Sequence, residues 1–126
     1  MERILSDIRS VPGVTGAMVL AKESLNSYHL LPASFTTNSI KEVGMKLLKL
    51  SEKMPPHSRL DLKFDNGIGL VYNLQKSVIL IFGRSNLDFS FLGVILKSAL
   101  QSIERKLEEE TPKPDQIKDL SAFMID

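Results

Sequence analysis

The first residues that could take part in chemistry are two glycines in the stretch VPGVTGAMVL, residues 11–20 of a chain of 126. Loops that bind phosphate place such glycines after a strand and before a helix, so that free backbone amides face the anion. Here Gly13 follows a helical pattern and Gly16 opens a strand pattern, with no Lys-Ser or Lys-Thr behind them. We therefore interpret Gly13 as a turn residue and Gly16 as a point where another element packs closely.

Side chains that bind metals or transfer protons are few and scattered. The chain has two histidines, His29 and His57, and neither has the spacing of a metal site. Asp61 and Asp65 alternate with Lys63 on one strand face, which indicates a solvated face rather than an acid/base pair across a cleft. No Gly-x-Ser-x-Gly stretch positions a serine nucleophile. We therefore expect no metal, no cofactor and no catalytic residues.

Arginine and aromatic residues near position 85 have two interpretations each. Arg84 could act as an arginine finger that stabilises phosphoryl-transfer charge, or it could face water or pair with Asp88 at a strand end. Phe89 and Phe91 could stack on bases, but the chain carries 16 Lys and Arg against 15 Asp and Glu. Without a basic groove, nucleic acid is not an expected partner, and we expect both phenylalanines to pack in the core.

Composition places the chain among single soluble globular domains, with 43% apolar and 25% charged residues. The absence of cysteine favours a reducing compartment, and we expect a cytoplasmic protein. The N-terminus, MERILSDIRS, does not resemble a secretory signal, and no apolar run approaches the roughly 20 residues of a membrane span.

The apolar spacing predicts eight elements that must position these residues. Residues 2–10 repeat as an amphipathic helix, and residues 14–21 and 28–32 are two strands joined by the turn KESLNS. A second helix covers residues 37–54, with Thr37, Asn38 and Ser39 as candidate N-caps. Its apolar stripe is broader than one face needs, because Met45 and Leu48 lie beside the main line.

Three consecutive antiparallel strands and a long helix complete this domain. Residues 59–65 and 68–74 alternate polar and apolar side chains around Asn66-Gly67, which we expect to supply two left-handed turn positions. Residues 78–82 are apolar on both faces and predict a central strand, and the last helix begins near Asp88. We assign residues 1–110 to the domain and 111–126 to a linker with a short amphipathic tail, marked by Ile117, Leu120 and Phe123.

This order of elements, α-β-β-α-β-β-β-α, together with the VPGVTGAMVL entry to the first strand, resembles the roadblock family. The family includes the roadblock dynein light chains and the bacterial and archaeal regulators of Ras-like GTPases, and the resemblance covers residues 2–108. Members often carry an Asp-Gly turn between the first two strands, whereas this chain has KESLN at residues 22–26. The resemblance implies an α+β, roadblock/longin-like fold whose five-stranded antiparallel sheet lies between the second helix and the other two.

The resemblance also implies a homodimer with one continuous sheet and the two middle helices side by side. The pairing strand would be the edge strand of residues Arg59, Leu60, Asp61, Leu62, Lys63 and Phe64. Unpaired backbone groups on such an edge can pair with a second copy. The surplus apolar residues of the middle helix would be covered by that copy or by a partner. The predicted partner-binding residues are Lys41, Met45, Leu48, Lys49 and Glu52.

The function that these expectations favour is a non-enzymatic, dimeric regulator that binds a small Ras-like GTPase or another signalling protein. The alternative is a structural adaptor that bridges larger proteins without changing nucleotide turnover. An enzyme is the third and least favoured hypothesis. The tail stripe at Ile117, Leu120 and Phe123 could fold back on its own domain or insert into a groove on a partner.

Overall fold

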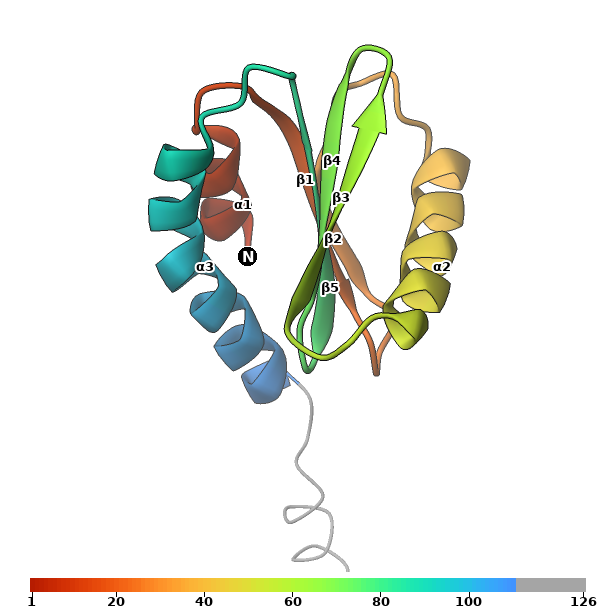
Figure 1. Ribbon diagram of the computed structural model, residues 1–126. Coiled ribbons are helices and arrows are strands. Elements are labelled where there is room, and N and C mark those ends of the chain that lie inside the picture. Colours follow the sequence, from red (N-terminus) through yellow and green to blue (C-terminus); the bar gives the residue numbers. More distant parts are fainter. Residues whose placement is uncertain (111–126) are drawn as a thin grey trace, which may run out of the picture.

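The computed structural model describes residues 1–110, and of Glu110 its backbone alone; the predicted linker and tail, 111–126, lie outside the described residues. Figure 1 shows three layers, with a sheet between two helices on one side and one on the other. The elements follow the predicted order: α1 (Glu2–Arg9), β1 (Val14–Ala21), β2 (Ser27–Leu30), α2 (Thr37–Lys53), β3 (Ser58–Phe64), β4 (Gly67–Asn73), β5 (Ser77–Gly83) and α3 (Phe89–Glu110).

The five strands form one antiparallel sheet in the order β2-β1-β5-β4-β3. β5 is the central strand, as its two apolar faces predicted, and its side chains from Val78 to Ile81 are buried. β3 and β2 are the two edges. β3 pairs with β4 over seven consecutive residues without a bulge, whereas β2 has only four residues.

Each face of the sheet has its own apolar core. On one face, α1 and α3 pack over side chains that include Val19, Leu70 and Ile81. On the other face, α2 places Leu47 against Met18, Val71, Val78 and Leu80. Because strand side chains alternate between faces, β1, β4 and β5 supply both cores, which is why they contain few polar residues.

Both glycines of the opening stretch have the predicted roles. Gly13 has φ +92°, and a Cβ atom there would lie 2.6 Å from the Cα of Leu87. A Cβ on Gly16 would lie 3.0 Å from the Leu31 side chain, at a register shift between β1 and β5. The glycines therefore let the loop before α3 and the end of β2 approach β1 closely.

Two local predictions were wrong. The β3–β4 turn consists of Asp65 and Asn66, since Phe64 pairs with Gly67, and neither Asn66 nor Gly67 has positive φ. Gly67 is required instead by packing, because a Cβ there would lie 2.5 Å from the carbonyl oxygen of Gly83.

The N-cap of α2 is Thr36 rather than any of the three predicted residues. Its Oγ1 accepts a hydrogen bond from the Ser39 amide at 3.1 Å. The cap was missed because four consecutive residues, Thr36 to Ser39, can all cap a helix, and the backbone conformation decides among them.

Candidate functional site

The outer surface of α2 has two different flanks. Gly44, Leu47 and Ser51 face the sheet and are buried. On the flank toward β3, Val43, Leu50 and Met54 are partly buried, and they pack against the same core as Leu60 and Leu62 of β3.

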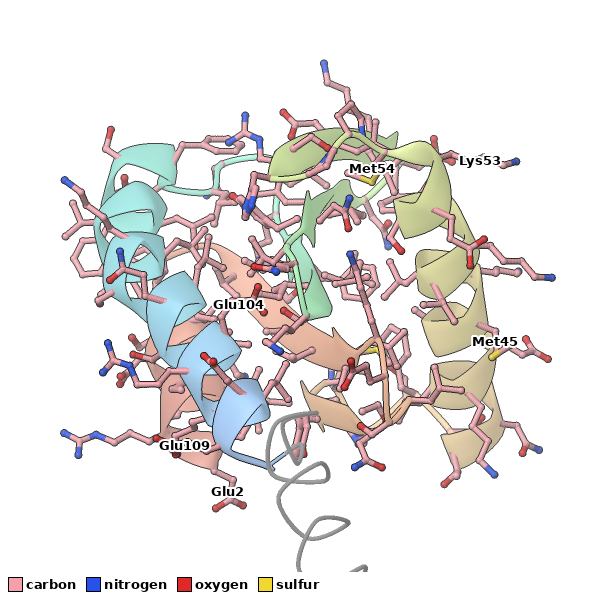
Figure 2. The ribbon with its side chains drawn as sticks, turned by 90° about the horizontal axis from the view of Figure 1, so that it is seen from below. Glu2, Met45, Lys53, Met54, Glu104 and Glu109 are labelled. Carbon is pink, nitrogen blue, oxygen red and sulfur yellow. The ribbon has the colours of Figure 1, made fainter. Side chains whose placement is uncertain are left out.

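The opposite flank faces β1 and β2 and carries the surplus apolar residues that the sequence indicated. Met45 is 53% exposed, and in Figure 2 it projects from α2 away from the sheet. Leu48 is partly buried. The flank toward β3 and the flank toward β2 are therefore separate surfaces.

A groove of about 210 Å³ lies between this second flank and the end of the β1–β2 hairpin. This volume is below the roughly 300 Å³ of the smallest typical small-molecule sites, so it suits a side chain of a partner protein. A flexible methionine at the rim can adapt to different contact surfaces. The groove is lined by Met18, Leu20, Leu25, Ser27, Ile40, Lys41, Gly44, Met45 and Leu48.

Leu25 is a member of this groove that sequence reasoning missed. It lies in the β1–β2 turn with φ 62°, a left-handed conformation that L-residues other than Asn and Asp rarely adopt, and it is 51% exposed. Its amide donates to the carbonyl of Ala21 at 3.0 Å, which closes the turn. One feature of the sequence could have pointed to Leu25. The turn between the first two strands lacks the Asp-Gly pair common in the resembled family, and leucine does not favour the turn conformation that Gly or Asp would adopt there.

The charged residues predicted for partner binding lie at the groove or on the outer surface beside it. Lys41 lines the groove, and Lys49 and Glu52 are exposed on the same helix. With Met45 and Leu48, they form a surface with an apolar centre and a charged rim, an arrangement common in protein interfaces.

β3 forms an exposed edge on the other side of the molecule. Leu60 and Leu62 are partly buried, while Phe64 is 50% exposed and its ring centre lies 6.5 Å from that of Phe82. Arg59 and Asp61 point to the opposite face and form an ion pair, with Nε and Oδ1 2.8 Å apart. Both are about half exposed, so the pair contributes little to stability.

The other candidate residues lie apart from one another. His29 is exposed on β2, and His57 is exposed between α2 and β3 with φ 57°. Among the described residues, no three His, Asp or Glu side chains gather as a metal site. Arg84 is exposed after β5, and Asp88 caps α3 by accepting a hydrogen bond from the Phe91 amide at 3.0 Å.

The prediction that Phe89 and Phe91 pack in the core was wrong. Each is 47% exposed, and Val94 is 72% exposed. The inward face of α3 is set by Leu92, Leu96, Ala99, Ile103 and Leu107, which repeat at helical spacing and are all buried. Phe91 and Val94 fall outside that stripe and remain at the surface. Phe89 lies three residues before Leu92, in line with the stripe, but it is the first residue of α3 and is exposed there.

No helix in residues 1–110 combines the length and apolar character needed to span a bilayer. No protein-family model and no curated protein matches the chain. Among solved structures, the chain is similar to a Roadblock/LC7 domain from Streptomyces avermitilis, with 14% identity, a TM-score of 0.67, and coverage of 86% of this chain and 98% of that one. It is also similar to MglC from Myxococcus xanthus, with 11% identity, a TM-score of 0.50, and coverage of 87% and 98%.

Proposed function

With the fold of a Roadblock/LC7 domain as the premise, we propose that this protein is a non-enzymatic, cytoplasmic homodimer that binds a small Ras-like GTPase or a comparable signalling protein. The observation that carries the proposal is the groove beside α2, where Leu25, Met45 and Leu48 expose apolar surface. Exposed apolar residues with a charged rim are a common sign of a protein-binding surface.

The proposed dimer forms through the edge of β3, from Arg59 to Phe64. This edge is longer and more regular than β2, and its backbone groups can extend the sheet into a second copy. A copy placed there would approach the α2 flank that carries Val43, Leu50 and Met54. The groove on the other flank would stay open, so each subunit could bind a partner while the dimer is intact.

The proposed mechanism is conformational. The partner's switch regions would lie across Lys41, Met45, Leu48, Lys49 and Glu52 and be held in one arrangement. A direct role for Arg84 in phosphoryl transfer is disfavoured by its position. It follows the end of β5 that pairs with Val14, whereas Leu25 follows the far end of β1, about 23 Å away along an eight-residue strand.

The position of Arg84 also favours a second candidate function, that of an adaptor. No arginine within residues 1–110 lines the groove, so a protein bound there could be bridged to another protein without a change in its nucleotide turnover. The regulator and the adaptor share the same groove and the same dimer, and they differ only in the effect on the bound partner.

The test uses a Ras-like GTPase encoded in the same genome and measures its affinity, GTP hydrolysis and nucleotide exchange with and without the full chain. We expect Met45→Glu to weaken binding about tenfold or more, because a charge would replace an apolar contact at the groove. The matched control is Val94→Glu, which places the same charge at an exposed apolar site on α3.

The outcomes separate the hypotheses. A change in either rate that Met45→Glu abolishes supports the regulator. Binding that is sensitive to Met45→Glu without any change in rate supports the adaptor. If Met45→Glu and Val94→Glu changed the affinity for the GTPase equally, the binding surface would lie elsewhere. If the natural chain did not bind the GTPase, a GTPase would not be its partner.

A further inference from the structure

A second, larger groove of about 980 Å³ runs along α3 on the face of the sheet opposite α2. Its floor is formed by Tyr72 of β4 and by Leu74 in the turn that follows this strand. Its wall is formed by Leu96 and Leu100 of α3. All but Leu96 are only partly buried. On this face α1 contacts β1 and β2, and α3 contacts β5, so the groove lies over the part of the sheet toward β3.

The rim of this groove is mainly basic. Arg59, Lys76, Lys97 and Arg105 line it, together with two acidic residues, Glu104 and Glu108. The Glu104 carboxylate already accepts hydrogen bonds from the Lys76 amide, at 3.0 and 3.2 Å, and from Ser77 Oγ, at 3.1 Å. In Figure 2, Glu104 lies on the side of α3 turned to the sheet.

Tyr72 gives the floor a polar atom as well. Burial raises the pKa of its hydroxyl, and the neighbouring Arg59 guanidinium opposes that rise. The contact with Tyr72 in turn raises the pKa of Arg59. Both groups therefore keep their ordinary protonation state at neutral pH. The groove therefore offers an apolar floor and a rim on which basic residues outnumber acidic ones.

We propose that this groove binds the C-terminal segment of the same chain, residues 115–126, as a short helix antiparallel to α3. The segment is amphipathic in sequence, with Ile117, Leu120 and Phe123 on one side. These residues would cover Tyr72, Leu74 and Leu100. Asp115 and Asp119, four residues apart and so on one face of a helix, would meet the basic rim.

The length of the chain fits this path. The groove reaches Glu108 at one end of α3, and the segment begins only a few residues later, after Thr111-Pro-Lys-Pro. A connection of four residues is typical between antiparallel helices. Twelve helical residues, 115–126, span about 17 Å, and the part of α3 that lines the groove spans about 22 Å from Gly93 to Glu108. The segment is therefore short enough to lie wholly within the groove.

The absence of cysteine from the sequence makes a direct test possible. If the two helices pair antiparallel about the centre of the connection, residues 111–114, residue 115 would lie beside residue 110 and residue 124 beside residue 101. The full chain carrying Gln101→Cys and Met124→Cys is treated with a short bismaleimide cross-linker at low protein concentration. We expect a cross-link within one chain, detected by mass spectrometry. The matched control is Lys106→Cys with Met124→Cys, because Lys106 is exposed on α3 but does not line the groove.

We expect the Gln101 pair to react about tenfold faster than the control pair, and Leu120→Asp to reduce its rate about tenfold, since one buried leucine shifts an equilibrium by at least that factor. Circular dichroism checks that each variant is folded. Equal rates for the two pairs, or no effect of Leu120→Asp, would overturn the proposal. Cross-links formed only between chains would show that the segment binds a second molecule instead.

Discussion

Leu25 combines two features that are unusual at the level of one residue. Its backbone is left-handed, which costs an L-residue about 1 kcal/mol, and its apolar side chain is half exposed. Strained residues that persist at a surface are often part of a binding site. Here the strain directs a leucine into the groove that Met45 and Leu48 also line.

The conformation predicts opposite effects on stability and on binding. Leu25→Gly should raise the free energy of unfolding by about 0.5 to 1 kcal/mol, because glycine adopts positive φ without strain. The same variant should weaken partner binding, because the groove loses an apolar wall. Urea denaturation measures the first effect and titration with the partner measures the second.

Leu25→Ala is the matched variant, because it removes the side chain and keeps the backbone strain. It should leave stability near that of the natural chain and weaken binding as much as glycine does. If glycine lowered stability, the left-handed turn would not be a source of strain. If alanine left binding unchanged, Leu25 would not be part of the interface.

At the level of elements, buried and partly buried polar side chains form hydrogen bonds between helices and strands. The spacing of apolar residues predicts each of these elements by itself and does not predict such bonds. Asn73 is buried at the end of β4 and donates to the carbonyl groups of Met54 and Pro55, at 3.2 and 3.1 Å. Lys22 donates to Asn73 Oδ1 at 2.7 Å and to the carbonyl of Leu74 at 2.6 Å. These bonds join the ends of β1, α2 and β4.

Glu104 connects α3 to the β4–β5 turn in the same way. Glu104→Ala removes the acceptor of the Lys76 amide and of the buried Ser77 hydroxyl, so it should lower the free energy of unfolding by about 1 to 3 kcal/mol. Denaturation with urea gives the value. Glu109→Ala, an exposed glutamate on the same helix, is the control and should change stability by less than about 0.5 kcal/mol. Equal losses in both variants would mean that Glu104 contributes only helix propensity.

At the level of the whole molecule, the sheet has one long edge and one short edge, and the dimer proposal depends on this difference. Leu62→Lys on β3 places a charge at the proposed interface and should convert the dimer to a monomer in light scattering. Leu30→Lys makes the same change on β2, the other edge, and should leave the dimer intact. Circular dichroism shows whether each variant is folded.

This pair of variants separates pairing from folding. A folded Leu62→Lys chain that remains a dimer would show that β3 is not the pairing strand. A dimer lost only in Leu30→Lys would move the interface to β2. A natural chain that is monomeric at high concentration would remove the dimer from the proposed function.

The sequence by itself determined the eight elements, their order, the central position of β5 and the side of each helix that is buried. These features depend on the spacing of apolar residues, because burial selects a period of two in strands and of 3.6 in helices. It also identified Met45 and Leu48 as surplus. The spacing alone could not place Phe89, which lies three residues before Leu92 in line with the buried stripe but is exposed as the first residue of α3. It does place Phe91 away from that stripe, where the structure leaves it exposed.

Only the tertiary structure decided where the surplus residues lie. Periodicity gives the angle of Met45 around α2, but not the position of α2 across the sheet, which depends on packing with β1, β4 and β5 together. That position puts Met45 at the groove on the β2 side of α2, away from the β3 edge, and brings Leu25 of the β1–β2 turn into the same groove. The groove is formed by residues that are far apart in the sequence, so the spacing of residues within one helix or strand cannot predict it.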